Sequence, residues 1–258
     1  MTQNEVTAEL SGAKVVVTGA GSGVGAASAA LFAARGATVA VCDIDESAAR
    51  RVATELASRG LSAVPLRVDV SDEQPLARCS EEAASAMGGV TTVHVNAAVM
   101  TAHGNGLDTT AEQFDTTMGV NARGAFLTAR AFLPHLLAAG KGALCFTGSD
   151  TALRTSRDYA SYLTSKHAVI GIARSVAVDF GGRGIPSNIV TPGVTDTGGL
   201  RVLNRLVERP LVAPGPGAAR VEHGGPPASV GAHRARTGEQ AMLTRHIQRR
   251  VGNGSYGG

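Results

Sequence analysis

The sequence predicts an α/β protein with a doubly wound, Rossmann-type parallel sheet and helices on both faces. Short apolar and β-branched runs, typical of strands buried on both faces, alternate with helical stretches along residues 11–200. Polar residues follow several of these runs directly, and ligands of such sheets lie beyond the carboxyl ends of the strands. The length of 258 residues is sufficient for one domain with a sizeable core.

The elements can be placed in chain order from their periodicity. A strand at 14–18 leads into a glycine-rich turn, and a helix at 26–35 and a strand at 38–42 follow. We expect Ser71 to cap a helix at 72–87 and Pro134 to bend a long helix at 110–139. The other expected elements are helices at 47–59 and 158–181 and strands at 62–68, 90–95, 142–147 and 187–190.

The composition excludes several classes of protein. Hydrophobic residues make up 43% and charged residues 17%, which favours a compact fold over disorder. Aromatic residues are only 3%, so stacking platforms for nucleic acid are not expected. The three cysteines are widely spaced and predict neither a metal site nor an oxidising compartment. Because no apolar run approaches membrane-spanning length, we expect a cytoplasmic protein without membrane contacts.

The first strand, turn, helix and second strand together predict a dinucleotide site. Residues 19–25 hold four glycines, which let the backbone approach a pyrophosphate at the N-terminus of the following helix. Asp43 follows the second strand, where a carboxylate can accept both ribose hydroxyls of NAD and would repel a 2′-phosphate. Ser22 supplies no cation for such a phosphate. We therefore expect NAD rather than NADP.

Tyr162 and Lys166 form a candidate proton-transfer pair. Residues four apart lie on one face of a helix, and a nearby cation lowers a phenol pKa, ordinarily about 10, by about 1–3 units. Ser149 precedes Tyr162 by 13 residues, across a connection that can bring the two hydroxyls together. Tyr159 has a leucine, Leu163, where Tyr162 has the lysine, so we expect it only to line the pocket.

These motifs together resemble the short-chain dehydrogenase/reductase family over residues 11–200. The resemblance is carried by Thr18-Gly19-Ala20-Gly21-Ser22-Gly23-Val24-Gly25, Asp69-Val70, Val120-Asn121-Ala122-Arg123-Gly124, Ser149, the Tyr162/Lys166 pair and Pro192-Gly193-Val194 with Thr197. It implies cofactor-binding positions at Gly19, Ser22, Gly23, Val24, Gly25, Asp43, Ile44, Asp69, Val70, Asn96, Ala97, Ala98, Tyr162, Lys166, Pro192, Gly193, Val194 and Thr197.

The resemblance also implies catalytic roles. Tyr162 would act as general acid–base, while Lys166 would lower its pKa and reach the nicotinamide ribose. Ser149 would bind the substrate oxygen, and Asn121 would hold a water that links Lys166 to solvent. Structural roles stay open for Ser149 as a turn cap and for Asn121 as a partner of backbone groups.

One segment departs from the family pattern. The expected Asn-Asn-Ala-Gly appears as Val95-Asn96-Ala97-Ala98, so that one asparagine and the glycine are lost. If the last position needs positive φ, Ala98 adds strain of about 1 kcal/mol. His94 lies between two valines, and we interpret it as a packed histidine rather than a titrating group of the site.

Residues 201–258 form an atypical tail. They hold nine arginines and three acidic residues, a balance of +6, whereas the whole chain carries +3 and residues 1–200 therefore −3. From residue 210 onward there are five prolines and ten glycines without apolar periodicity. Our hypothesis is that the reading frame changes, or the sequence diverges, shortly after Arg209. A basic arm for nucleic acid is disfavoured because the charges are dispersed.

We therefore expect an NAD(H)-dependent oxidoreductase that transfers a hydride between nicotinamide and a secondary alcohol or ketone. Two alternatives stay open, an NAD-binding or interaction protein without catalysis and an NADPH-dependent 3-oxoacyl reductase. The resemblance implies a homo-oligomer, a dimer or tetramer built on the helices near 110–139 and 158–181, although the tail argues against the tetramer. The candidate pocket residues are mostly apolar and favour a cyclic or apolar substrate: Val99, Met100, Thr151, Leu153, Tyr159 and Val194.

Overall fold

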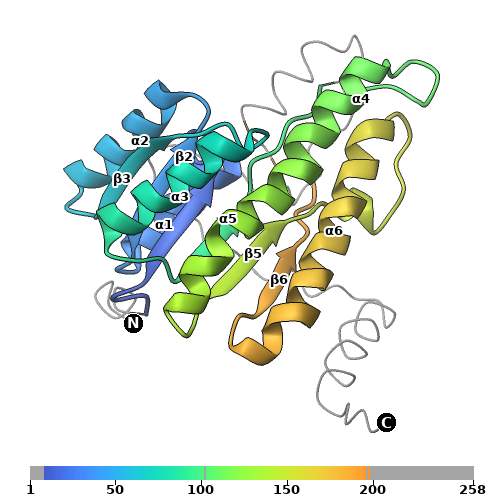
Figure 1. Ribbon diagram of the computed structural model, residues 1–258. Helices are drawn as coiled ribbons and strands as arrows, with labels where there is room; N and C mark the ends of the chain where they lie inside the picture. Colours follow the sequence, from blue (N-terminus) through green and yellow to red (C-terminus); the bar gives the residue numbers. More distant parts are fainter. Residues whose placement is uncertain (1–8, 102, 196, 198–258) are drawn as a thin grey trace, which may run out of the picture. The chain divides into compact units, whose positions relative to one another are not determined.

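A parallel sheet of six strands in the order β3-β2-β1-β4-β5-β6 organises the protein, as predicted (Figure 1). The computed structural model describes residues 9–101, 103–195 and 197, all within one compact unit. The predicted tail at 201–258 lies outside the described residues, so its division from the domain and its changed reading frame stay predictions. The strands are β1 (Lys14–Thr18), β2 (Thr38–Asp43), β3 (Ala63–Arg67), β4 (Thr92–Val95), β5 (Ala143–Thr147) and β6 (Ser187–Val190).

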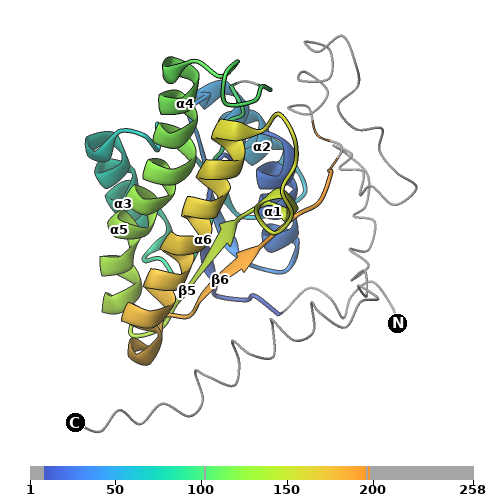
Figure 2. The ribbon, with the colours of Figure 1, turned by 90° about the vertical axis from the view of Figure 1, so that its right-hand side faces the viewer.

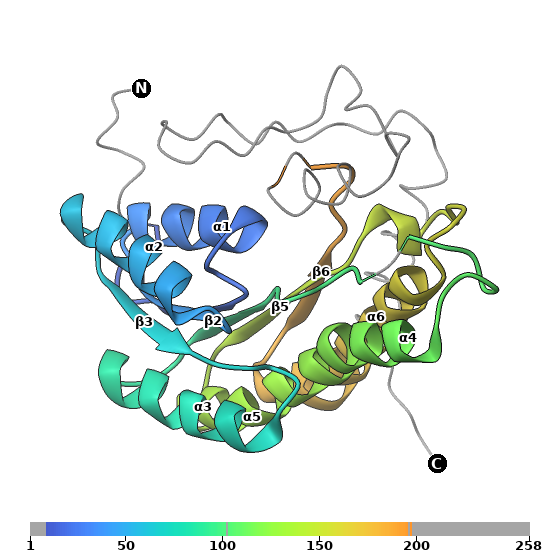
Figure 3. The same cartoon turned by 90° about the horizontal axis from the view of Figure 1, so that it is seen from above.

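Helices cover the sheet in two layers. Seen from above, α1 and α2 lie on one face, and α3, α5 and α6 lie on the other (Figure 3). A quarter turn of the molecule shows α5 and α6 running side by side along β5 and β6 (Figure 2). The helices are α1 (Gly23–Ala34), α2 (Glu46–Ser58), α3 (Glu73–Met87), α4 (Ala111–Met118), α5 (Gly124–Ala138) and α6 (Ala160–Phe180).

The central strands are buried on both faces because their side chains are apolar and β-branched. Val16 belongs to the core beneath α3, α5 and α6, whereas Val15 and Val17 belong to the core beneath α1 and α2. All neighbouring strands pair in parallel, so their carboxyl ends share one edge of the sheet. Asp43 and Asn96 lie at that edge, and Ser149 follows it closely.

The predicted long helix at 110–139 is interrupted. A π-helical turn at Gly119–Arg123 separates α4 from α5, while α5 continues through Pro134. The interruption therefore lies at Gly119–Arg123, and the bend expected at Pro134 stays a prediction. The turn carries Asn121, whose side chain is held by a distant loop, and π-turns of this kind recur at functional sites.

Two local predictions are corrected. Asp72, rather than Ser71, caps α3, because its carboxylate accepts the N–H of Gln74 at 3.1 Å while the Ser71 hydroxyl donates to Asp69 at 2.7 Å. Among the described residues other than glycine, Asp158 has a left-handed backbone, with φ of 63°. Ala98 does not have positive φ. The conditional strain at Ala98 therefore does not arise.

None of the described helices has the length and hydropathy needed to cross a membrane.

Candidate active site

A cavity of about 420 Å³ lies beyond the carboxyl ends of β1, β2, β4 and β5. It gathers side chains and backbone from positions that are far apart in the sequence, as the parallel sheet requires. The cofactor positions predicted from the sequence that line it are Gly19, Ser22, Gly23, Val24, Gly25, Asp43, Ile44, Asp69, Val70, Asn96, Ala97, Ala98, Tyr162, Lys166 and Thr197.

The glycine-rich turn packs too closely for side chains. A Cβ at Gly25 would lie 2.0 Å from the carbonyl oxygen of Gly19 and 2.7 Å from Nδ2 of Asn96. Gly19 itself has φ of 67°, and a Cβ there would meet Cα of Ala97 at 2.8 Å. Ser22 precedes α1 but makes no side-chain cap bond, so the first N–H groups of this helix face the cavity uncapped. This cradle fits the pyrophosphate of a dinucleotide.

Asp43 is held rigidly at the adjoining wall of the cavity. Its Oδ2 accepts the N–H of Gly21 at 2.8 Å, and its Oδ1 accepts the N–H of Asp45 at 3.0 Å. Each oxygen keeps a further lone pair for a ligand hydroxyl. A carboxylate fixed in this way suits recognition of a ribose diol.

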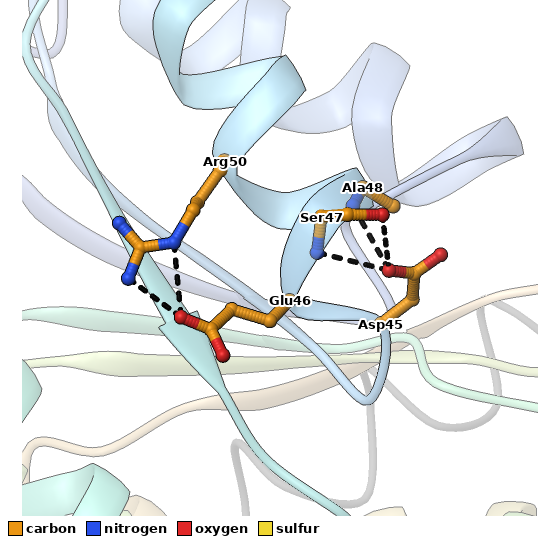
Figure 4. A network of polar contacts seen from close by, with 5 residues as sticks. All are labelled: Asp45, Glu46, Ser47, Ala48 and Arg50. Carbon is orange, nitrogen blue, oxygen red and sulfur yellow. Dashed lines mark hydrogen bonds and ion pairs between the residues drawn. The ribbon is translucent and has the colours of Figure 1, made fainter.

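The start of α2 fixes the loop that follows Asp43 (Figure 4). Asp45 caps the helix, since its Oδ1 accepts the Ser47 hydroxyl at 2.7 Å and the backbone N–H groups of Ser47 and Ala48 at 2.9 and 3.1 Å. The Ser47 hydroxyl and then the Ala48 N–H hold the pKa of Asp45 below its ordinary value. Glu46 and Arg50 add an i,i+4 ion pair on the exposed side.

Tyr162 and Lys166 lie together at the cavity, on the first turns of α6. Lys166 is 2% exposed, and its ammonium donates to the carbonyl of Thr147 at 2.9 Å and lies 5.5 Å from the centre of the Tyr162 ring. Burial lowers the pKa of Lys166 to about 8. Burial raises the pKa of the Tyr162 phenol, and a hydrogen bond with Ser149 lowers it only in part. Burial therefore dominates the shift of the Tyr162 pKa, and the predicted lowering by Lys166 stays a prediction.

Ser149 and Asn121 are buried and are not among the residues that line the cavity, although Ser149 bonds to Tyr162, which does line it. The Ser149 hydroxyl accepts the Thr151 hydroxyl at 2.8 Å and caps the short 3₁₀ turn at Asp150–Ala152. The Asn121 amide bonds to both backbone groups of Val99, at 2.7 and 2.9 Å, and donates to the Ser165 hydroxyl at 3.0 Å. Asn121 therefore fixes the loop at Val99, which itself lines the cavity.

His94 is packed in the sheet, as predicted from its flanking valines. It is 4% exposed, with Val17 and Cys145 beside it in the neighbouring strands and the ring of Phe32 edge-on at 6.1 Å. Its Nε2 lies 2.9 Å from the Thr147 hydroxyl, and its Nδ1 has no partner among the described residues. Burial lowers the pKa of His94 to about 4.

Acid should therefore destabilise the protein through His94. The unfolded chain takes up a proton at this residue below pH ~6.5, whereas the folded chain resists until about 4, so stability falls as the pH decreases across that window. The shift corresponds to about 3 kcal/mol. Urea unfolding at several pH values should show that His94→Gln removes this loss. Val17→Ala, a neighbouring core substitution without a titrating group, should cost the same at every pH. Parallel wild-type and His94→Gln curves would contradict the assignment.

Some predicted residues lie outside the cavity lining, and some lining residues were not predicted. Pro192, Gly193 and Val194 do not line it; Pro192 instead accepts the Asp150 N–H at 3.0 Å. Of the predicted pocket residues, Val99 lines the cavity, while Tyr159 packs beside Tyr162 with ring centres 6.3 Å apart. The other residues predicted for the substrate pocket do not line the cavity: Met100, Thr151, Leu153 and Val194. Three residues line the cavity without having been predicted: Val68, Val120 and Thr147.

Comparison with known proteins shows the family to which the chain is related. Residues 13–206 match the family described as short chain dehydrogenase. The chain is 37% identical over 184 residues to the 1-deoxy-11-beta-hydroxypentalenate dehydrogenase of Streptomyces exfoliatus, covering 70% of this chain and 67% of that protein. It is 39% identical over 186 residues to the 2-(R)-hydroxypropyl-CoM dehydrogenase of Xanthobacter autotrophicus, covering 70% and 74% respectively.

Among solved structures, the fold is similar to the 3-ketoacyl-(acyl-carrier-protein) reductase from Brucella melitensis complexed with NADH. The TM-score is 0.71 and the identity 30%, over 75% of this chain and 80% of that one. The family match covers more than half of the sequence and includes the described cavity and both layers of helices. The chain belongs to the short-chain dehydrogenase/reductase family.

Proposed function

We propose that this protein is an NAD(H)-dependent oxidoreductase that interconverts a secondary alcohol and a ketone, with Tyr162 as general acid–base. The observation that carries the proposal is the shared cavity: Tyr162 and Lys166 line the same space as the glycine turn and Asp43. A proton-transfer group and a dinucleotide cradle in one cavity suit hydride transfer.

The mechanism assigns a task to each side chain. A nicotinamide bound in the cavity would supply or accept the hydride. In reduction of a ketone, the Tyr162 phenol donates its proton to the substrate oxygen, and this protonated form is the one that its raised pKa favours. In oxidation, the ionised phenol takes the proton of the substrate hydroxyl, while the Ser149 hydroxyl holds the substrate oxygen. Lys166, with a pKa of about 8, can exchange a proton near neutral pH and supplies positive charge beside the phenol ring. Asn121 holds the Val99 loop at the cavity wall.

A preference for NAD rests on Asp43. Its two oxygens are aligned by backbone N–H groups and would accept ribose hydroxyls, whereas a 2′-phosphate would meet a fixed negative charge. Arg51 donates to the Gly21 carbonyl at 3.0 Å and places a positive charge near the glycine turn, which the sequence did not reveal. A cation there would attract a 2′-phosphate, so this residue favours the NADPH alternative. The complex of the Brucella reductase with NADH supports the NAD assignment by family likeness.

Asp43→Asn should therefore weaken NADH binding by about tenfold to a hundredfold, the effect of losing one hydrogen bond to a charged group. NADPH binding should weaken less or improve, because the repulsion is removed. Fluorescence titration with both nucleotides measures this change in preference. Asp45→Asn, at the exposed cap of α2, serves as the control and should leave the preference unchanged. Equal loss for both nucleotides in Asp43→Asn would argue against the NAD assignment.

The substrate is proposed to be a small secondary alcohol or ketone with an apolar or cyclic body. The cavity that Tyr162 lines also has Val99 and Val120 in its lining, and the 2-(R)-hydroxypropyl group in the name of one relative is a secondary alcohol. Initial rates with matched linear and cyclic secondary alcohols test the class. A cytoplasmic location stays a prediction from the sequence.

A homodimer built on α5 and α6 is also proposed. A groove of about 570 Å³ runs between these helices, and its lining is largely apolar, with Leu133, Ile172 and Phe180 among its residues. Phe126 in the same groove is 50% exposed, so the groove adds apolar surface to an exposed face of the kind that marks interaction sites. The molar mass of the protein in solution tests this proposal, since a homodimer has twice the mass of one chain.

A further inference from the structure

Thr147, at the carboxyl end of β5, lies at the centre of a hydrogen-bond chain. Its hydroxyl lies 2.9 Å from Nε2 of His94 and 3.1 Å from Oδ1 of Asn96. The Asn96 amide in turn donates to the carbonyls of Thr18 and Gly19, at 3.0 and 3.3 Å. This series of hydrogen bonds therefore connects His94, in a core strand, with the glycine turn.

The partners fix the direction of every bond. Since Asn96 Nδ2 faces two carbonyl oxygens, it must be the donor there, and its Oδ1 must accept. The Thr147 hydroxyl, with a single proton, therefore donates to Asn96 and accepts from His94. The proton of the neutral imidazole must then sit on Nε2, which agrees with an Nδ1 that has no partner in the described part of the chain.

We propose that Thr147 is a positioning residue for the cofactor cradle and that His94 acts through it. The inference rests on the proposed function. Turning the Thr147 hydroxyl would release the Asn96 amide, and the space beside that amide is tight: a Cβ at Gly25 would lie 2.7 Å from its Nδ2. The same threonine accepts the Lys166 ammonium on its backbone carbonyl at 2.9 Å. One residue thus contacts both the group that holds the glycine turn and the cation beside Tyr162.

The competing interpretation is that His94 and Thr147 form a buried polar pair that only stabilises the sheet. Thr147 differs from such a pair because it lines the cavity itself, together with Asn96 and Lys166. A stabilising role alone predicts lower resistance to urea without a change in cofactor affinity. A positioning role predicts weaker binding of the cofactor by a protein that remains folded.

Variants at His94 can separate the two readings because glutamine and asparagine reach different distances. Glutamine places an amide N–H near the position of Nε2, whereas asparagine reaches only as far as Nδ1. His94→Gln should therefore preserve the donor to Thr147, and His94→Asn should lose it. Thr147→Ser keeps the hydroxyl and Thr147→Val removes it. Thr128→Val is the matched control, since Thr128 is a buried threonine on α5 that donates to the Gly124 carbonyl.

Fluorescence titration with NADH, supported by urea unfolding of each variant, tests the proposal without requiring turnover. We expect His94→Asn and Thr147→Val to raise the Kd for NADH by about tenfold, equivalent to about 1.4 kcal/mol. His94→Gln, Thr147→Ser and Thr128→Val should stay within about threefold of wild type. The double variant His94→Asn/Thr147→Val should bind no worse than Thr147→Val, because His94 acts through Thr147.

Folded His94→Asn and Thr147→Val proteins with wild-type affinity would overturn the inference, as would additive losses in the double variant. If Thr147→Val does not fold, His94→Asn decides, since it retains the threonine. A wild-type protein that does not bind NADH would overturn the proposed function and this inference with it. Binding by wild type with no effect of the variants would overturn the inference alone.

Discussion

Tyr162→Phe should lower the turnover of a secondary alcohol with NAD by about 10²–10⁴-fold, the contribution of a positioned acid–base group. The substitution removes one oxygen from a partly buried ring and leaves the packing of α6 in place. Without the phenol, neither Lys166 nor Ser149 can take the hydroxyl proton at the same position. Initial rates followed by the absorbance of reduced nicotinamide measure the loss, and NADH titration should show nearly unchanged binding.

The control for this variant lies three residues earlier. Tyr159→Phe makes the same chemical change on a ring whose centre is 6.3 Å from that of Tyr162. Its turnover should stay within about threefold of wild type, because no lysine accompanies it on α6. Wild-type turnover by Tyr162→Phe, or an equal loss in both variants, would exclude Tyr162 as the specific acid–base group.

Gly25→Ala should weaken NADH binding by at least about a hundredfold. The added Cβ would lie 2.0 Å from the Gly19 carbonyl, a contact with backbone that no rotamer change can relieve. The turn must therefore move away from α1, and the N–H groups at the helix terminus lose their alignment with a pyrophosphate. Titration of the folded variant with NADH measures the effect.

Gly181→Ala provides the matched glycine substitution, since a Cβ there meets nothing within 4 Å. Its backbone has φ of −57°, so alanine fits and should stabilise the protein by about 0.4–1 kcal/mol without changing NADH affinity. Wild-type affinity in Gly25→Ala would mean that the cofactor does not use this cradle.

Sequence patterns located the sheet well because its strands are short, buried and β-branched. The strands β1 and β6 begin and end at the predicted residues, and the acidic residue Asp43 closes β2 as expected. The π-helical turn was beyond such reasoning. It carries the contact of Asn121 with Val99, which joins segments 22 residues apart and leaves no periodic signal.

The candidate site was predictable where its chemistry depends on spacing along the chain. The glycine turn and the Tyr162/Lys166 pair are of this kind, since each is set by one element. The raised pKa of Tyr162 was not predictable, because it reflects burial by the assembled fold. Thr147 was missed for a similar reason: a threonine at the end of a strand is ordinary until His94 and Asn96 are seen on either side.

The most direct test of hydride transfer at this site is incubation of the wild-type protein with NAD and a panel of linear and cyclic secondary alcohols. We predict that the reduced-nicotinamide absorbance grows with at least one alcohol, faster with NAD than with NADP, and that Tyr162→Phe slows the growth by about 10²–10⁴-fold. Absence of any change with every alcohol, and with the matching ketones and NADH, from a protein that binds NADH would contradict the account. That result would instead favour a nucleotide-binding protein without catalysis.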